Sequence, residues 1–317
     1  MNAGNATSQG HISPMQHSMN DVRESGAAPS LIVRGTLVRV ASLEADGFDH
    51  PTAVPALLSR VRQGPQALDI ITLVQTLPHT SPEFSYPMEW DNAAAIPVST
   101  FENWWNVQVD RKTRNVVRKS EKQGIVVSEL AFDEPLVRGI VDIYNECPVR
   151  HGKAFWHYGK DFDTVKRENA SFLERSVFLA ALWQDEIVGF AKMVISNDGL
   201  QARLMQILSK VSHRDKSPTN ALIAEAVRAC AARNIGHLCY GRFSYGKKQR
   251  DSLTDFKENN GFKRVEVPRY YIPLTVRGKL AMRLGLQHRL ADRVPESMLA
   301  VFRDARRRWY ASAPSAS

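Results

Sequence analysis

Cysteine is scarce in this sequence, and long apolar runs are absent from it. Three cysteines occur among 317 residues, Cys147, Cys230 and Cys239, and none belongs to a CxxC pair or a cysteine–histidine cluster. This spacing argues against a disulfide framework and against a zinc site, so we expect no bound metal. No stretch reaches the roughly 18 consecutive apolar residues that a membrane-spanning helix needs, and we expect no transmembrane segment.

The sequence also lacks three common catalytic signatures and a targeting peptide. It has no Walker phosphate loop, no GxSxG motif and no HExxH motif, which are the simplest signals of P-loop NTPases, serine hydrolases and zinc proteases. Residues 1–30 are polar, with neither the apolar block of a secretory signal nor the arginines of a transit peptide. We expect a flexible tail over 1–30 and a cytoplasmic protein with reduced cysteines.

The charge balance is basic and is spread along the chain. The 42 Lys and Arg residues outnumber the 33 Asp and Glu residues, which gives a formal net charge of +9, and 43% of the residues are hydrophobic. This composition is typical of a globular protein, and the length corresponds to about two domains of roughly 150 residues. The positive charge favours a polyanionic ligand such as a phosphate-rich cofactor, RNA or an anionic membrane surface.

Apolar periodicity predicts an irregular first half of the chain. The expected elements are, in order, a strand at 31–40, a helix at 54–62, a strand at 68–74, a loop at 78–90, a strand at 93–98, one basic helix from a cap at Ser99 or Thr100 to Gly124, a strand at 125–130 and a helix at 133–144. Pro97 restricts its strand to an edge or its own end. An aromatic segment follows at 148–162.

The second half has clearer signals. They predict a hairpin of strands 177–183 and 187–195, a third antiparallel strand at 203–209, a helix at 218–234, a strand at 237–243, a helix at 253–259 and a strand at 263–274. We therefore expect an α/β fold with flanking helices around a mixed sheet, in which antiparallel strands adjoin a parallel strand–helix–strand junction. In such a junction both helices begin at the same edge of the sheet.

Basic residues surround both of these helix starts. Ser217 can cap the first helix, where Arg214 and Lys216 add two cations, and Lys247 and Lys248 precede the second helix. Helix N-termini offer unpaired amides and partial positive charge, so two of them with these cations favour phosphate binding. The alternative is two capped helices beside solvated charges.

Three segments carry a family resemblance. Residues 255–262 (DFKENNGF) resemble the FYEKxGF segment that closes the fold of the GNAT acyltransferases, and residues 214–219 (RDKSPT) stand in the place of their (Q/R)xxGx(G/A) pyrophosphate loop. Residues 112–127 (KTRNVVRKSEKQGIVV) are similar to a stretch of the Fem-type aminoacyltransferases, which have a GNAT-like fold and an aminoacyl-tRNA donor. The GNAT resemblance covers about 131–275, and the Fem-like one extends it back to about 100.

The resemblance implies a reduced GNAT-like half at 31–130, a GNAT-like acyltransferase domain at 131–275 and a set of site residues. Composition adds the tail at 1–30, and an apolar stripe beside several arginines predicts a basic helical tail at 276–317. The expected donor-binding residues are Arg214, Lys216, Ser217, Thr219, Asn220, Lys247 and Lys248. The oxyanion amide is expected on the preceding strand, at Gln206, Ile207 or Leu208. The catalytic candidates are His157, Tyr158 and Tyr245, for which aromatic packing is the alternative role.

The chain departs from the GNAT pattern at three positions. Ser217 and Thr219 replace the two small residues of the pyrophosphate loop, where glycine lets backbone amides approach the phosphates. Lys257 stands where the family's tyrosine often acts as a general acid, so Tyr245 on the neighbouring loop is a possible substitute.

Three functions are compatible with these features. The first is an N-acyltransferase that moves an acyl group from acyl-CoA to a small-molecule or peptide amine. The second is a Fem-like transfer from aminoacyl-tRNA, in which the basic helix at 111–122 would contact the RNA. The third is a catalytically idle GNAT-like module that binds RNA or a membrane.

Overall fold

A computed structural model describes residues 30–64, 67–150, 152–244 and 252–287. Its main sheet has ten strands: β1 (Leu31–Arg34), β2 (Val40–Leu43), β3 (Ile70–Val74), β4 (Met88–Pro97), β5 (Val126–Leu130), β8 (Ser176–Trp183), β9 (Glu186–Ile195), β10 (Gln201–Ser209), β11 (His237–Cys239) and β12 (Lys263–Pro273). A small separate hairpin is formed by β6 (Val149–Arg150) and β7 (Lys153–Ala154).

The α-helices are α1 (Val54–Gln63), α2 (Phe101–Asn103), α3 (Arg111–Lys122), α4 (Glu134–Asn145), α5 (Phe162–Asn169), α6 (Pro218–Ala232), α7 (Ser252–Asn259) and α8 (Val276–Arg283). A π-helical turn at Trp104–Gln108 and 3₁₀ turns at Leu173–Arg175 and Val211–Lys216 complete the helical segments of the described chain. No helix in these ranges combines the length and the apolar composition needed to cross a bilayer.

The order of strands confirms the predicted fold class. Strands β5, β8, β9 and β10 form an antiparallel array, and β10 then pairs in parallel with β11 after the crossover through α6. The sheet is therefore mixed, with the parallel junction where the sequence predicts it. The predicted elements of the second half are all present. The predicted strand at 237–243 is shorter in the structure, where β11 ends at Cys239.

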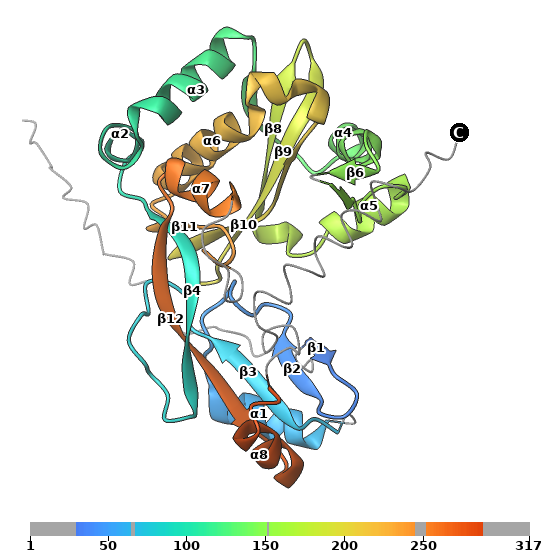
Figure 1. Ribbon diagram of the computed structural model, residues 1–317, viewed down its shortest axis with the longest axis vertical. Helices are drawn as coiled ribbons and strands as arrows, with labels where there is room; N and C mark the ends of the chain where they lie inside the picture. Colours follow the sequence, from blue (N-terminus) through green and yellow to red (C-terminus); the bar gives the residue numbers. More distant parts are fainter. Residues whose placement is uncertain (1–29, 65–66, 151, 245–251, 288–317) are drawn as a thin grey trace, which may run out of the picture.

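Strand β12 joins the first half of the chain to the second. It pairs antiparallel with β3 on one side and with β4 on the other, and β4 in turn pairs with β11. The two long strands β4 and β12 consequently run from the region of α6 and α7 to the region of α1, β1 and β2 (Figure 1). Pro97 is the last residue of β4, as its missing N–H requires.

Two helical layers cover the sheet of the second half. Alternate residues of β8 point to opposite layers: Leu179 packs in the core beneath α6, and Phe178 packs in the core beneath α4 and α5. Helix α3 and the short α2 lie beside α6 (Figure 1). Trp104 is fully buried in the α6 layer, and its indole N–H donates to the Asn260 carbonyl at 3.2 Å.

Three predictions in the first half differ from the structure. The strand expected at 31–40 is a hairpin, because Gly35 has a φ of +84° and the chain turns back so that Arg34 pairs with Val40. The single basic helix expected up to Gly124 is broken, because Val109 is extended and the Asp110 side chain caps α3 through the Thr113 amide. The loop expected at 78–90 is also shorter, since β4 already begins at Met88.

Candidate active site

The candidate active site lies where β10 separates from β11. These strands pair only from Gln201 to Arg203, and a register shift between Leu204 and Gln206 marks a bulge in β10. Beyond Arg203 no strand of the described chain pairs with β10 on the β11 side. A bulge re-aims the backbone and is common beside active sites.

The bulge determines which backbone amides point into this opening. The Lys210 N–H donates to the Val188 carbonyl on β9, and backbone groups alternate between the two sides of a strand. The N–H groups of Gln206 and Leu208 therefore point to β9, whereas the N–H of Ile207 points to the β11 side. Among the three expected oxyanion residues, Ile207 has the amide with the required direction, and its side chain is buried under α6.

A set of polar side chains from α4 and β6 lies beside the end of β10. The Tyr144 hydroxyl donates to the Gln206 side-chain oxygen at 2.7 Å, and the Arg150 guanidinium donates to the Ser209 carbonyl at 2.9 Å. Burial raises the pKa of Tyr144 to about 12, so at neutral pH it is a protonated donor. Tyr144 is therefore suited to orient Gln206 and unsuited to accept a proton.

Glu146 connects α4 to the loop that follows β10. Its carboxylate accepts hydrogen bonds from the amides of Val211 and Ser212, at 2.6 and 2.9 Å, and from the Ser212 hydroxyl at 2.7 Å. Burial alone would raise the pKa of Glu146, but these hydrogen bonds outweigh it and lower the pKa. Glu146 thus holds the start of the expected donor loop as an anion.

His157 and Tyr158, two of the catalytic candidates, have different surroundings. His157 is 6% exposed, and its ring packs on Tyr144 and Trp156 with centroid distances of 4.1 and 4.0 Å. Burial and the nearby charge of Lys160 lower the pKa of His157 to about 4, so it is neutral at pH 7 and a weak base. The Tyr158 side chain is half exposed.

The loop from Val211 to Ser217 has the shape of a tight turn before α6. Ser217 has a left-handed backbone, with φ of 53° and ψ of 45°, and its side chain makes no capping hydrogen bond. The expectation of a side-chain cap is therefore wrong, because this backbone does not have the extended conformation of a capping serine. The residue instead has the conformation that glycine most readily adopts, at a position where the GNAT pattern has a small residue.

The other expected donor-binding residues are distributed around this turn. Arg214 is exposed, and the Lys216 amine lies 4.8 Å from the centroid of the Trp183 ring. The Thr219 hydroxyl lies 3.1 Å from the Ser209 hydroxyl, and the Asn220 amide donates to the Asn260 side chain at 3.0 Å. Tyr245, Lys247 and Lys248 lie outside the described residues.

Lys257, which replaces the family's tyrosine, is buried. It is 1% exposed, donates to the Arg242 carbonyl, and lies 4.9 Å from the centroid of the Tyr240 ring. Its ammonium group therefore binds the backbone that follows β11. Lys257 has no hydroxyl that could act as the family's tyrosine does.

Lys192, opposite Gln206 on β9, is a second buried lysine. Its ammonium group donates to the carbonyls of Asn169 and Ser171, at 2.8 and 2.5 Å, and the residue is 1% exposed. Burial lowers the pKa of Lys192 to about 8. Keeping Lys192 charged in the folded protein therefore lowers the free energy of unfolding. This cost is largest below pH 8 and disappears when the pH rises past the pKa of lysine in the unfolded chain, roughly 10.4.

Removal of the Lys192 charge is expected to change the pH dependence of stability. Between pH 8 and pH 10 the wild type should gain about 2 kcal/mol of unfolding free energy relative to Lys192→Met, because the unfolded chain binds the extra proton in this range. Urea unfolding at both pH values measures this difference. Lys263→Met, at an exposed lysine, is the control. Equal pH dependence of wild type and Lys192→Met would contradict the expectation.

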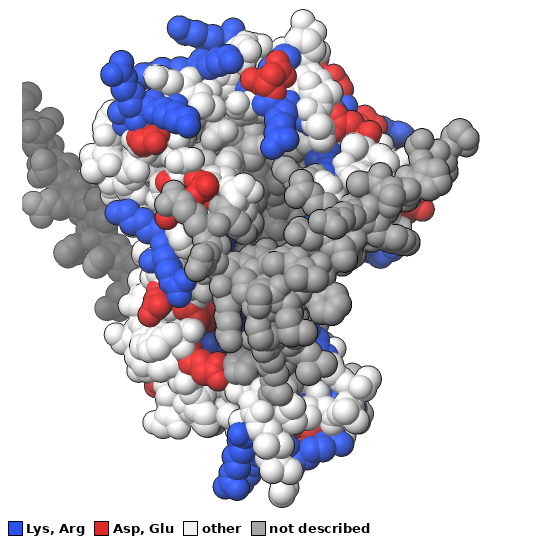
Figure 2. Space-filling view, in the orientation of Figure 1, with Lys and Arg blue, Asp and Glu red and all other residues white. Residues whose placement is uncertain are grey.

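The exposed face of α3 is basic. Figure 2 shows Lys and Arg side chains gathered at the end of the molecule where α3 lies. A shallow hollow of about 500 Å³ on this helix is lined by Arg111, Lys112, Asn115, Val116 and Lys119. Arg114 has a structural role instead, since it donates to the carbonyls of Trp105 and Val109 at 3.0 and 2.6 Å.

No local sequence pattern indicated a role for the polar residues of α4 and β6. Tyr144 lies within the helix predicted at 133–144, and the sequence suggested no function for Glu146 or Arg150. Their partners Gln206, Ser212 and Ser209 are about 60 residues away in the chain, so no local motif connects them.

The comparisons with known proteins identify the fold. No protein-family model and no curated protein sequence matches the chain. FemX matches in structure with a TM-score of 0.56 at 10% identity, over 82% of this chain and 88% of that chain. The C-terminal domain (DUF2156) of a protein assigned as a lysylphosphatidylglycerol synthetase from Agrobacterium fabrum gives 0.54 at 11% identity, over 80% and 83%. L-PGS from Bacillus licheniformis gives 0.50 at 11% identity, over 81% and 84%.

At this level of identity the likeness establishes the fold. It confirms the expectation of a GNAT fold with a Fem-like segment.

Proposed function

We propose that this chain, which shares its fold with FemX and with lysylphosphatidylglycerol synthetase domains, is an acyltransferase that acts on an amine at the opening between β10 and β11. The observation that carries the proposal is the bulge in β10, which directs the Ile207 amide into this opening next to the start of α6. The acceptor is a small-molecule or peptide amine, the protein works in the cytoplasm, and residues 131–275 form the catalytic unit.

The chemistry requires an activated carbonyl, a positioned amine and an oxyanion donor. The amine nitrogen attacks the thioester or ester carbon, the developing oxyanion accepts a hydrogen bond from the Ile207 N–H, and the thiol or alcohol leaves. The amine must lose a proton during the reaction. Tyr245, which precedes α7 in the sequence and lies outside the described residues, stays our candidate to protonate the leaving group, and Tyr158 our candidate for the acceptor wall.

Acyl-CoA is the first donor we propose. The left-handed Ser217 supports it, because this backbone keeps the turn of a phosphate-binding loop although the side chain is not glycine. A left-handed backbone at a residue other than glycine costs about 1–3 kcal/mol, and residues of this kind cluster at functional sites. Arg214 and Lys216 would then bind the phosphates together with Thr219, Asn220, Lys247 and Lys248.

A calorimetric titration with coenzyme A and acetyl-CoA tests this donor. We expect saturable binding to the wild type and about tenfold weaker binding to Arg214→Ala, because a charge-assisted hydrogen bond to phosphate is lost. Arg62→Ala, at an exposed arginine on α1, is the matched control and should bind as the wild type does. Absence of binding at millimolar ligand would exclude acyl-CoA.

Aminoacyl-tRNA is the second candidate donor, and the basic face of α3 favours it. Arg111, Lys112 and Lys119 are exposed on one helix and border a hollow. Cations in such an array bind a phosphate backbone with a strong dependence on salt.

Charge reversal on α3 tests the second donor. We expect Lys112→Glu combined with Lys119→Glu to weaken tRNA binding and to lower the slope of log affinity against log salt by about 1 per phosphate contact. Arg60→Glu combined with Arg62→Glu places the same charge change on the exposed face of α1 and is the control. Filter binding at several salt concentrations measures both. Equal weakening in the two double variants would show that net charge alone is responsible, and the RNA assignment would fail.

A further inference from the structure

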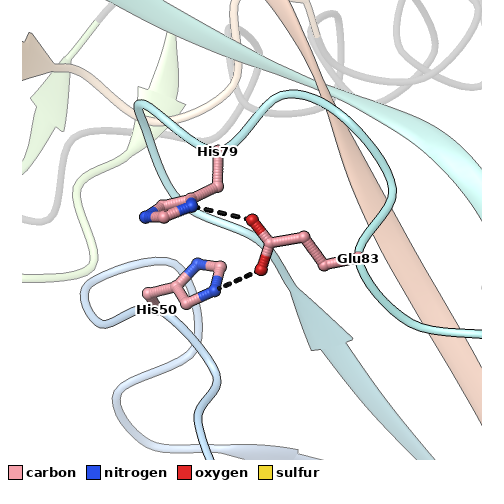
Figure 3. Close-up of side chains that lie close together, drawn as sticks. All are labelled: His50, His79 and Glu83. Atoms are coloured by element: carbon pink, nitrogen blue, oxygen red, sulfur yellow. Dashed lines mark hydrogen bonds and ion pairs between the residues drawn. The ribbon is translucent and has the colours of Figure 1, made fainter.

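Two histidines and a glutamate meet outside the candidate active site, in the first half of the chain. His50 lies in the loop after β2, and His79 and Glu83 lie in the segment between β3 and β4 (Figure 3). The Glu83 carboxylate is shared between the two rings: Oε2 lies 2.9 Å from His50 Nε2, and Oε1 lies 2.7 Å from His79 Nδ1. The ring centroids of the histidines are 3.9 Å apart.

The donor atoms of this cluster are close enough to bind one ion together. One ligand atom from each residue lies within 4.8 Å of the other two. Tetrahedral zinc bonds of roughly 2.0–2.1 Å to nitrogen and oxygen place the ligand atoms about 3.3–3.4 Å from one another. Small side-chain rotations therefore convert the present contacts into a three-ligand site with a fourth position for water.

The Nε2 atom of His50 faces Glu83, and its buried Nδ1 has no hydrogen-bond partner in the described part of the chain, so Glu83 contacts only one side of this ring. The three side chains together offer a divalent cation two neutral nitrogen ligands and one negatively charged oxygen ligand.

We propose that His50, His79 and Glu83 bind one divalent transition-metal ion of the zinc type. Two imidazoles and one carboxylate suit Zn²⁺, Ni²⁺ or Co²⁺ and do not suit Mg²⁺ or Ca²⁺, which prefer oxygen ligands. The scattered cysteines predicted no metal site, whereas this cluster contains no cysteine. The 28 residues between His50 and His79 carry no metal-site pattern.

The ion would join two loops that both contact the second half of the chain. Beside His50, the Asp49 carboxylate pairs with Arg175 at 2.5 and 2.8 Å and accepts the Asn197 amide at 3.0 Å. The segment of His79 and Glu83 is tied to β12, because the Glu83 amide donates to the Tyr270 hydroxyl at 2.9 Å. The proposed metal therefore connects the loop after β2 to the neighbourhood of β12, independently of any acyl transfer.

Calorimetric titration of the metal-free full chain with ZnCl₂ tests the site. We expect one ion per chain, with affinity at least tenfold weaker in His50→Gln and in His79→Gln. His237→Gln is the matched control, because His237 also has a buried Nδ1 without a partner among the described residues but lies in β11. Zn²⁺ should raise the melting temperature of the wild type and of His237→Gln, and should leave both cluster variants unchanged.

Two results would overturn the proposal. One is no uptake of Zn²⁺ by the wild type, and the other is an unchanged stoichiometry and affinity in both cluster variants. Should those variants fail to fold by circular dichroism, the visible spectrum of Co²⁺ bound to the wild type decides the question. Bands of a low-coordinate nitrogen–oxygen site that disappear on addition of Zn²⁺ support the assignment, and an aqua-ion spectrum refutes it.

Discussion

Replacement of Arg269 by methionine is expected to lower the free energy of unfolding by about 3–5 kcal/mol, the usual cost of removing one partner from a buried ion pair. Its guanidinium donates to Asp91 at 2.8 Å and to Asp46 at 3.0 Å, and also to the Thr72 hydroxyl at 3.1 Å. Without Arg269 two largely buried carboxylates lose a shared cation. Urea unfolding at pH 7 measures the loss.

The loss should also depend on pH. Burial alone would raise the pKa of Asp91, but Arg269 and Arg242 outweigh it and lower the pKa. A carboxyl group whose pKa is lower in the folded state than in the unfolded state stabilises the protein at pH values above its unfolded pKa, near 3.8. This stability is lost as the pH falls through the pKa of the folded state. The difference between wild type and variant should therefore shrink when the pH falls from 7 to below 4.

Arg264→Met is the control for Arg269. Arg264 lies on the same strand and pairs with Glu266 at the surface, so its removal should cost less than about 1 kcal/mol. A similar loss in both variants would show that Arg269 contributes no more than a surface pair.

Replacement of Ile207 by proline is expected to lower kcat by about 10²–10³, the usual effect of deleting one oxyanion-hole donor. Proline removes the N–H that points to the β11 side, and this N–H belongs to no ladder bond with β9. The affinity for the donor should change little, because the amide contacts the charge that develops in the transition state. Steady-state transfer from the donor that binds, together with calorimetry of that donor, measures both quantities.

Two further variants separate the amide from the side chain. Ile207→Val keeps the N–H and trims the buried side chain, so kcat should stay within a few-fold of the wild type. Leu208→Pro removes an N–H that points to β9 and should destabilise the sheet instead. A value of kcat for Ile207→Pro equal to that of Ile207→Val would contradict the assigned role of the amide.

The second half of the fold was predictable because its signals are local. A hairpin turn at 184–186, a turn at 197–199 and apolar faces of regular period define β8, β9, β10 and α6 in the chain order that the structure confirms. The first half has weaker signals. Its strands β1 and β2 have four residues each, and such short strands depend on their partners more than on their own sequence.

The candidate site was predictable only in part. The position of the proposed donor loop follows from the order of elements, and Ile207 lies in the expected strand segment. The direction of its amide depends on a bulge whose register no local sequence pattern specifies. The left-handed turn at Ser217 could not be predicted from the sequence, because a serine before a helix usually indicates a side-chain cap.

The place of β12 between β3 and β4 has a consequence for how this protein folds during synthesis. Strand β12 lies between β3 and β4 in the sheet, but the ribosome makes it about 165 residues after β4. Strands β3 and β4 therefore each keep an unpaired edge until β12 emerges. Unpaired strand edges invite association between chains. Pairings of such long sequence separation also slow folding. The central sheet therefore closes last, after the α6 layer has the residues it needs to form.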